Sequence, residues 1–514
     1  MPTSTRPSAR CTPRSAWTPT ARPSCTPARA ADRAVVGNAG WGQRVRDDRA
    51  GEGWGGSRQV LSRASELAVD YLEGLPGRRV DAITGYAEVI DALGGPLPET
   101  GTDAGEVVER LARVCGPATI ASAGPRYFGL VVGGALPAAL AADWLVSTWD
   151  QTAYSRMSSP AGAAVDAVAE RWVLAALSLP ASAAVGFTTG ATAGNAVGLL
   201  TARHALLSRQ GWDVDADGLA DAPRLRVLVG EEVHPSVLQV VRMIGFGSRK
   251  VERVPVDDQG AMRADALADV LDADPTPAIV CAQVGNVNTG ACDPVGEIVA
   301  ATHAHGGWVH VDGAFGLWAR ASARRSGLVA GVETADSWST DAHKWLNVPY
   351  DCGLAIVSDP AATRAALGAN TAYLPTVADR EPGMLVPEMS RRARAVPVYA
   401  ALASLGRVGV EALVDRCCDH ARRLADAMRA EDGFRVRNDV VLNQVLLHAD
   451  DDDTTWRVAE LVRLSGEGWV AGTHWRGQAA VRVSFSNWST TEDDVDRLVG
   501  ALRDARERAR RTPR

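Results

Sequence analysis

Short apolar runs alternate with helix-like stretches through the centre of the chain. Each run has the length and composition of a buried strand, and each of the first four precedes a turn marked by glycine or proline. The five runs are Ala184–Phe187, Arg226–Val229, Ala278–Ala282, Trp308–Val311 and Leu354–Val357. This alternation predicts an α/β fold with a mostly parallel sheet covered by helices. Ligands of such sheets bind beyond the carboxyl ends of the strands, so we expect a functional site there.

The first 125 residues contain two segments of different pattern. Residues 1–56 are rich in Arg, Pro, Ser, Thr and Ala and nearly free of aliphatic periodicity, which predicts a disordered extension. Their composition superficially resembles that of a transit peptide, and a start site assigned too far upstream would look the same. From Val60 to Leu72, and again from Val107 to Val114, apolar residues recur at helical spacing. The sequence therefore predicts a helical arm over residues 57–125.

The pattern changes again after about residue 370. A proline-marked loop, Pro375–Glu388, precedes a largely helical run from Val398 to Met428. Strand-like pieces follow, with a helical stretch between the second and the third, at Val440–Leu442, Val445–Leu447 and Val481–Phe485. These elements predict a large domain over residues 126–370 and a smaller α+β domain over residues 371–514.

Composition and charge exclude some classes of partner. The 514 residues are 46% hydrophobic and 22% charged, which is ordinary for a soluble enzyme. Residues 1–50 carry nine Arg and three Asp, a net +6, so the remainder carries −13 to reach the total of −7. An acidic body without a basic stripe argues against a nucleic-acid partner. The longest apolar stretch, Leu130–Val146, is interrupted by glycine, proline and aspartate, so no membrane span is predicted.

The eight cysteines show no C-x-x-C spacing and follow no secretory signal. This usage predicts free, mostly buried thiols in a reducing cytoplasm. It predicts no metal site.

Lysine is nearly absent from the chain. Of 54 Lys and Arg residues, 52 are arginine, and only Lys250 and Lys344 are lysine. Arginine stays protonated at neutral pH, whereas a lysine amine can form a Schiff base with a carbonyl. Lys250 has charged neighbours and is interpreted as solvated surface. Lys344 lies in a largely apolar segment beside His343 and Trp345, which favours a chemical role over an ordinary exposed lysine.

Three further segments follow predicted strands and can act together with Lys344. Thr188–Asn195 opens a helix, so its N–H groups suit a phosphate, although many such turns bind nothing. Asp312 can keep a ring nitrogen protonated, although an aspartate after a strand is often a helix cap. His234 can lie flat on an aromatic ring, although an isolated histidine is often structural. The combination indicates one cofactor site more strongly than any single member.

These segments, in this order, resemble the pyridoxal-phosphate-dependent group II amino-acid decarboxylases. The resemblance extends from about residue 60 to residue 500 and implies the type I fold of aspartate aminotransferase, with a seven-stranded sheet in the large domain. The segments that carry it are Phe187–Asn195, His234–Ser236, Gly285–Pro294, His310–Ala314, Asp341–Trp345 and Asp351–Gly353.

The resemblance implies a role for each matched residue. Lys344 holds pyridoxal 5'-phosphate through its amine, Asp312 pairs with the pyridine nitrogen, and His234 stacks on the ring. The other implied cofactor contacts are Ala314 at the opposite face of the ring, and Gly190, Ala191, Thr192 and His343 near the phosphate. A homodimer with its sites at the subunit interface is implied as well.

The implied activity is decarboxylation of an L-amino acid to an amine and CO2. The chain departs from the family at Gly285–Val287, where a Gly-Thr-Thr is common, so one hydroxyl near the cofactor is missing. It departs again at Pro375–Glu388, which lacks the tyrosine that often protonates Cα in the family, and Tyr373 precedes this loop. His234 or a water can supply the proton instead. The alternatives are an aminotransferase, an aldehyde-forming relative, and a catalytically silent member, which the intact Lys344, Asp312 and His234 argue against.

Three residues are candidates for contact with the substrate. Tyr127 and Phe128 resemble a family segment near the substrate pocket and favour an aromatic or apolar side chain, although two core aromatics would have the same pattern. Arg482 is a candidate for the substrate carboxylate, or else a surface cation on a strand. Glutamate remains an alternative substrate, because the many arginines offer partners for a second carboxylate.

Overall fold

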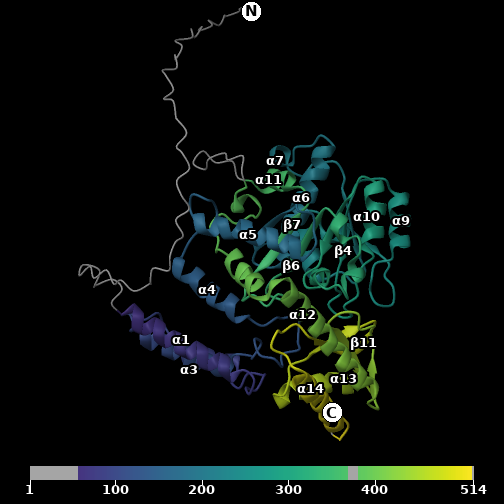
Figure 1. Ribbon diagram of the computed structural model, residues 1–514. Helices are drawn as coiled ribbons and strands as arrows, with labels where there is room; N and C mark the ends of the chain where they lie inside the picture. Colours follow the sequence, from purple (N-terminus) through teal and green to yellow (C-terminus); the bar gives the residue numbers. More distant parts are fainter. Residues whose placement is uncertain (1–55, 369–379, 512–514) are drawn as a thin grey trace, which may run out of the picture. The chain divides into compact units, whose positions relative to one another are not determined.

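A seven-stranded sheet forms the centre of the computed structural model, which describes residues 56–368 and 380–511 (Figure 1). The strand order is β1-β7-β6-β5-β4-β2-β3. The strands are β1 (Ala184–Thr188), β2 (Arg226–Gly230), β3 (Val251–Val254), β4 (Ala278–Gln283), β5 (Trp308–Asp312), β6 (Ser337–Asp341) and β7 (Gly353–Val357). Only β7 runs antiparallel to its neighbours β1 and β6. The five predicted strands and the mostly parallel sheet are therefore confirmed.

Two strands of this sheet were not predicted. β3 lies at the edge, is only partly buried and contains two charged residues, so it has no apolar run. β6 has the polar sequence Ser-Trp-Ser-Thr-Asp, yet all five residues are buried. Its hydroxyls are satisfied by side chains of neighbouring elements, for example Ser337 by His310 and Ser339 by Asn195. A strand that buries polar groups in this way has no periodicity that reveals it.

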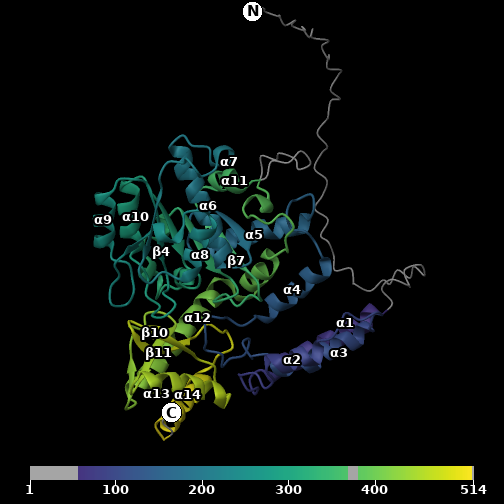
Figure 2. The same ribbon diagram turned by 180° about the vertical axis from the view of Figure 1, so that it is seen from behind.

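Helices cover both faces of the sheet, as the predicted fold requires. Val227 and Val229 of β2 pack in one cluster with residues of α6 (Ala191–Arg209) and α8 (Pro235–Met243), whereas Leu228 belongs to the larger cluster of the opposite face. Figure 2 labels α6 and α8 close together, beside the sheet. The other helices of this region are α4 (Pro137–Trp149), α5 (Pro160–Ala176), α7 (Val214–Asp217), α9 (Ala264–Ala273), α10 (Val295–Ala304) and α11 (Pro360–Leu367). Burial of both faces explains why the predicted strands are continuous apolar runs.

Short 3-10 helices connect several of these elements in the described part of the chain. They are η1 (Gly116–Ala118), η2 (Ser248–Lys250), η3 (Gly316–Ala321), η4 (Ser326–Val329), η5 (Val332–Thr334) and η6 (Pro382–Met384).

Helix α12 (Ala395–Arg429) contains the predicted helical run and bends at Gly406, whose φ is 61°. It is the one helix of residues 56–368 and 380–511 that is long and apolar enough to cross a membrane. Its apolar residues, from Ala395 to Met428, instead belong to the main hydrophobic core, and the helix packs on α4 and α5. The core of a folded domain therefore accounts for its composition.

The C-terminal region contains a second, antiparallel sheet in the order β10-β11-β9-β8. Its elements are β8 (Phe434–Val436), β9 (Gln444–Ala449), α13 (Asp452–Ser465), β10 (Ala471–Trp475), β11 (Gln478–Ser484) and α14 (Glu492–Arg511). The predicted strands at Val445–Leu447 and Val481–Phe485 lie in β9 and β11. The strand predicted at Val440–Leu442 is wrong, because these residues form bends. The buried Asn438 side chain bonds the backbone of Thr289, Gln444 and Leu446 there, which replaces strand pairing.

The described residues before position 126 are largely helical, as predicted. Its helices α1 (Ser57–Gly74), α2 (Tyr86–Leu93) and α3 (Ala104–Cys115) bury none of their residues within one chain. The buried Arg126 guanidinium connects the following segment to the C-terminal region, since it donates to the carbonyls of Arg78 and Glu467 at 2.7 and 2.8 Å. The predicted extension falls outside the described residues up to position 55, as do positions 375–379 of the predicted loop.

Candidate active site

The predicted residues converge at one edge of the large sheet. Asp312 is the last residue of β5, and Lys344 follows β6 by three residues. His234 ends the loop after β2 and caps α8, where its Nδ1 accepts a hydrogen bond from Ser236 N–H. The Gly190 turn follows β1. Strands β1 and β6 both flank the reversed β7 and therefore run in the same direction, and β5 is parallel to β6. The carboxyl ends of four strands therefore bring these residues to one place.

Lys344 is held by a carboxylate that the sequence pattern had not singled out. Lys344 Nζ lies 3.0 Å from Asp341 Oδ2, and the two side chains are 23% and 3% exposed. Asp341 Oδ1 accepts a 2.6 Å hydrogen bond from Ala191 N–H, the first residue of α6. One buried carboxylate thus connects the amine to the positive end of a helix.

His343 lies beside this pair. Its Nδ1 accepts a hydrogen bond from Cys352 N–H at 3.2 Å, so the proton of the neutral ring is on Nε2, 3.7 Å from Asp341 Oδ2. Burial lowers the pKa of His343, and Asp341 opposes this shift. Tyr350 stacks on the imidazole with ring centroids 4.2 Å apart. The ring next to Lys344 is therefore neutral near pH 7 and covered by a phenol.

His234 and Asp312 lie within electrostatic reach of each other and of Lys344. Burial lowers the pKa of His234, Asp312 raises it, and the cations Lys344 and Arg482 lower it further. Asp312 is 5% exposed, and its carboxylate accepts hydrogen bonds from Asn195 Nδ2 at 3.1 Å and from Ala314 N–H at 3.1 Å. The arrangement places a fixed carboxylate and a neutral imidazole beside the lysine.

Glycines shape the space between α6 and the sheet. A Cβ on Gly353 would lie 2.4 Å from the backbone of Gly190, and one on Gly133 would lie 1.8 Å from Lys344 O. Thr192 is exposed at the start of α6, and Ala191 is buried. The start of α6 can therefore present N–H groups to a phosphate at close range, next to His343 and Lys344. A lysine, a carboxylate, an imidazole and a helix N-terminus are together the donor set that pyridoxal phosphate requires, so the residues present fit this group.

The three predicted substrate contacts have different surroundings. The Arg482 side chain is partly buried, and its buried Nε has no hydrogen-bond partner among residues 56–368 and 380–511. Burial raises the pKa of Tyr127 to about 12, Tyr350 raises it further and Arg482 lowers it, so these three side chains are electrostatically coupled. Tyr127 stacks on Trp469 with ring centroids 5.0 Å apart. Phe128 is 1% exposed and packs on Phe485 in the core, as the alternative for it supposed.

The sequence analysis missed three residues that the fold adds to the site: Asp341, Tyr350 and Asn195. Asp341 and Asn195 both belong to segments that had been singled out, and the signal for Asp341 is its place three residues before Lys344. Tyr350 had no local signal, because its position depends on the turn after Lys344. Tyr373 and residues 375–379 lie outside the described residues, and the described remainder of that loop, 380–388, contains no aromatic residue.

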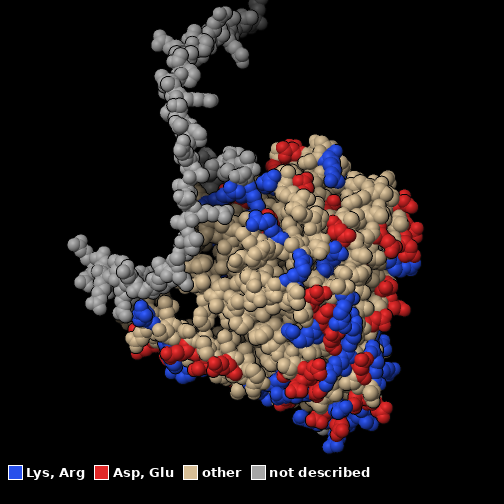
Figure 3. Space-filling model, in the orientation of Figure 1, with Lys and Arg blue, Asp and Glu red and all other residues tan. Residues whose placement is uncertain are grey.

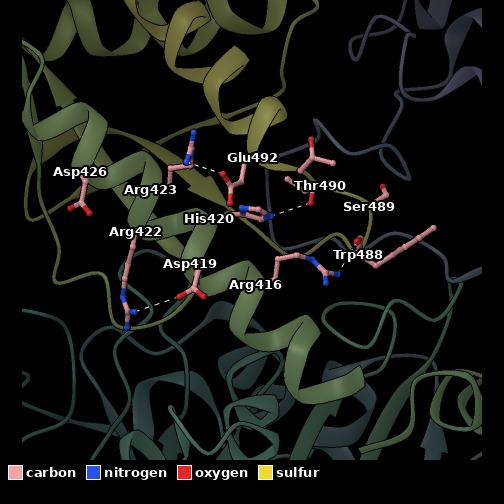
Figure 4. Close-up of a pocket in the computed structure, with 11 residues that line it drawn as sticks. Arg416, Asp419, His420, Arg422, Arg423, Asp426, Trp488, Ser489, Thr490 and Glu492 are labelled. Carbon is pink, nitrogen blue, oxygen red and sulfur yellow. Dashed lines mark hydrogen bonds and ion pairs between the residues drawn. The ribbon is translucent and has the colours of Figure 1, made fainter. Parts of the chain in front are cut away.

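A separate surface pocket of about 850 Å³ lies between α12 and the segment before α14 (Figure 4). In it Arg423 pairs with Glu492 and Asp496, Arg422 with Asp419, and His420 donates to Thr490 O. None of the residues described above lines it. Its charges largely neutralise one another, so the chemistry lies at the sheet edge and not in this pocket.

Comparisons with known proteins show the family and the fold of the chain. Residues 92–449 match the family described as “Pyridoxal-dependent decarboxylase conserved domain”. The chain is 26% identical to tryptophan decarboxylase 1 of Oryza sativa subsp. japonica, over 85% of this chain and 91% of the relative. It is 29% identical to L-2,4-diaminobutyrate decarboxylase of Rhizobium meliloti, over 87% and 90%. The crystal structure of Oryza sativa TDC with PLP and tryptamine superimposes with a TM-score of 0.83 at 22% identity, over 91% of this chain and 99% of that one. The fold is therefore the type I fold of pyridoxal-phosphate enzymes.

We expect Gly353→Ala to weaken the binding of pyridoxal phosphate by about 10-fold or more, because overpacking at 2.4 Å displaces the start of α6 from Asp341. Fluorescence titration of the cofactor-free protein measures the dissociation constant. Gly327→Ala is the control, since a Cβ there meets nothing within 4 Å. Equal affinity of both variants and the unsubstituted protein would contradict the role of the Gly190–Gly353 contact.

Proposed function

The chain belongs to the family of pyridoxal-dependent decarboxylases and is a pyridoxal-phosphate carboxy-lyase, and from this premise we propose that its substrate is an L-amino acid with an aromatic or apolar side chain. The products are the corresponding amine and CO2. The relatives act on tryptophan, on diaminobutyrate and on acidic amino acids, so membership of the family does not select the substrate. The choice rests on the side chains around the site.

The roles of the cofactor-binding residues follow from their positions. Lys344 would hold the cofactor through its amine, Asp312 would pair with the ring nitrogen, and the start of α6 from Gly190 to Thr192 would hold the phosphate. His234 and Ala314 would lie against the ring, with His343 next to the phosphate. Bound pyridoxal phosphate supplies an electron sink for the bond between Cα and the departing carboxylate.

One observation carries the proposal: Arg482 is a partly buried cation whose buried Nε has no hydrogen-bond partner among the described residues. Burial lowers the pKa of a guanidinium when nothing compensates its charge, and that is the direction found for Arg482. Its charge lowers the pKa of His234, which supports a position of Arg482 within electrostatic reach of the site. A substrate carboxylate there would supply the missing partner and would orient the Cα–carboxylate bond.

The aromatic preference is supported by the rings that surround this cation. Tyr127 and Trp469 form a stacked pair, and Tyr350 covers His343. Tyr127 raises the pKa of Arg482, which supports an aromatic ring close to the guanidinium. Aromatic side chains favour ring and apolar groups over charged ones, because stacking and area burial are lost with a charged partner.

Two groups of this site hold a proton at neutral pH that could be delivered to Cα. His234 carries it on Nε2, because its Nδ1 accepts from Ser236 N–H. Tyr350 carries it on Oη, since burial raises the pKa of this phenol to about 12. We assign the proton delivery to Tyr350, because the described part of the loop at 380–388 has no phenol.

A homodimer is part of the proposal. The helices α1–α3 bury no residue within one chain, and Leu61, Ile90 and Leu111 on them are 63%, 50% and 47% exposed. On α4, Trp144, Leu145 and Trp149 are also exposed. Figure 3 shows an area almost free of charged residues where Figure 1 labels α4 and α12. Apolar surface of this extent is typical of a protein interface, and a second copy of the chain would cover it.

We further propose a cytoplasmic location. The cysteines of the described residues are all free, and Cys281, Cys352, Cys417 and Cys418 are buried, which suits a reducing compartment.

We expect a visible absorption band when the protein binds pyridoxal phosphate. Lys344→Ala should abolish this band, whereas Lys250→Ala, at the other lysine, should keep it. With a panel of amino acids, CO2 and an amine should form from an aromatic one. CO2 from glutamate or diaminobutyrate alone would contradict the proposed substrate. A keto acid would instead identify an aminotransferase, and an aldehyde with peroxide an oxidative enzyme.

In the same assay Arg482→Met should raise the KM of the preferred amino acid by about 10- to 100-fold, because a charge-assisted contact with the carboxylate is lost. The absorption band should remain. An unchanged KM would exclude Arg482 as the carboxylate ligand.

Tyr350→Phe removes the hydroxyl and keeps the ring on His343. We expect a loss of amine formation of about 100-fold, because no phenol would deliver the proton to Cα. In air, the share of aldehyde should rise, since O2 can then oxidise the decarboxylated substrate to the aldehyde, with release of ammonia and peroxide. Chromatography of the products measures the ratio of amine to aldehyde. Tyr127→Phe, which also removes a phenol hydroxyl, is the matched control. If Tyr350→Phe forms amine at the original rate, the donor is another group.

Analytical ultracentrifugation should give twice the mass of one chain. The double variant Leu61→Glu and Leu111→Glu should sediment as one chain, because charge on α1 and α3 opposes burial of their apolar surface. Met243→Glu alters an equally exposed residue of α8, which lies outside this surface, and should remain dimeric. A single-chain mass for the unsubstituted protein would contradict the proposed dimer.

A further inference from the structure

A row of buried polar side chains extends from Asp312 into the core of the large domain. Asn195 Nδ2 lies 3.1 Å from Asp312 Oδ2, and Asn195 Oδ1 lies 2.9 Å from His310 Nε2. His310 Nδ1 lies 2.9 Å from Ser337 Oγ, which lies 2.9 Å from Trp308 Nε1. Asn195, His310 and Ser337 are all 0% exposed.

The chemistry of the two ends fixes the direction of every hydrogen bond in this row. An ionised carboxylate only accepts, so the amide nitrogen of Asn195 faces Asp312 and its oxygen faces His310. His310 must then carry its proton on Nε2, and the bare Nδ1 must accept from the Ser337 hydroxyl. An indole N–H only donates, so Trp308 donates to Ser337. Each group donates toward Asp312, and no other assignment satisfies all of them.

The fold brings the members together on one face of the sheet. Trp308, His310 and Asp312 alternate along β5, and His310 is paired in register with Ser337 of β6. Asn195 reaches them from the second turn of α6. A Cβ on Gly198 of the same helix would lie 2.4 Å from His310 Nδ1, so the absence of that side chain leaves the room that the imidazole occupies. Ser339 Oγ also donates to Asn195 Oδ1, which fixes the amide orientation a second time.

The sheet does not need this row of polar side chains for its stability. Neighbouring positions on the same face hold Val227, Val229 and Ile279, which pack without polar groups. Buried polar groups must all be satisfied, and a partly satisfied row is less stable than an apolar core. The polar row occurs where the sheet meets Asp312, and it ends at that carboxylate.

We propose that the row Trp308–Ser337–His310–Asn195 is a positioning relay that holds the Asp312 carboxylate in its orientation toward the ring nitrogen of the cofactor. The inference rests on the cofactor role of Asp312 stated above. Asn195 and His310 act through Asp312 and are positioning residues. Burial lowers the pKa of His310 to about 4, although Asp312 opposes the shift, so the imidazole stays neutral through the physiological range. A neutral imidazole keeps Nδ1 bare, which the direction of the row requires.

The first test uses the cofactor-free protein. In ¹⁵N NMR spectra of histidine-labelled protein, one imidazole that His310→Gln removes should remain in the neutral tautomer with its proton on Nε2 between pH 5 and pH 8. A proton on Nδ1, or titration of this ring between pH 5 and pH 8, would overturn the relay. Because no substrate is present, this result is independent of which amino acid the enzyme decarboxylates.

The second test is the affinity for pyridoxal phosphate, with the pH dependence of the absorption band of the bound cofactor. Asn195→Leu and His310→Leu should weaken binding by about 10- to 100-fold, because a hydrogen bond to a charged group is lost or misdirected. The pH midpoint of the band should shift in both. His310→Gln should recover most of the affinity, since its amide can donate to Asn195 and accept from Ser337.

Thr201→Val is the matched control. Thr201 is also a fully buried polar residue of α6, but its hydroxyl donates to Val197 O at 2.8 Å and not toward Asp312. It should bind the cofactor within about twofold of the unsubstituted protein, with the same pH midpoint. If Thr201→Val weakens binding as much as His310→Leu, or if Gln and Leu at position 310 behave alike, the row is only structural and the proposal fails. If the relay variants behave as expected but aromatic amino acids yield no CO2, the proposed substrate is wrong and the relay is still supported.

Discussion

Helix α6 lies closer to the central sheet than a helix with side chains on that face could lie. Gly190, Gly194 and Gly198 recur every fourth residue, so they occupy one face of the helix. A Cβ on Gly194 would lie 3.0 Å from Leu354 O, and one on Gly198 would meet the His310 ring. The complementary glycine on the sheet side is Gly353, against Gly190. This close packing is the constraint on which the site depends, because it delivers the start of a helix to the end of the strands.

The consequences of this contact are electrostatic. The start of α6 meets the Asp341 carboxylate, which in turn holds the Lys344 amine. One turn further along α6, Asn195 meets Asp312. A helix kept at a distance by ordinary side chains would reach neither carboxylate. The glycine face therefore aligns the Lys344 amine and the Asp312 carboxylate with one rigid element.

The polar content of β5 and β6 follows from the same arrangement. Strand β5 reads as an apolar run interrupted by His310, and β6 is polar at four of its five positions. In isolation these side chains would destabilise a buried sheet. Paired across the register with each other and with Asn195, every one of them has a partner. The helical arm differs from these strands, because the apolar residues of α1–α3 are not buried by the described residues of one chain.

The sequence by itself determined the parts of this protein whose physical signal is local. Apolar runs between glycine-marked turns predicted β1, β2, β4, β5 and β7, because strands buried on both faces have no polar positions. The near absence of lysine identified Lys344, and the predicted strands placed Asp312, His234 and the Gly190 turn after their ends. Only the tertiary structure decided which long-range neighbours complete the chemistry. Asp341 holds Lys344 because α6 presents Ala191 N–H to it, and Phe128 is a core residue because Phe485, directly after β11, packs on it. The polar strand β6 and the row behind Asp312 have no signal in the chain, since a buried hydrogen bond exists only when two distant segments bring its donor and acceptor together.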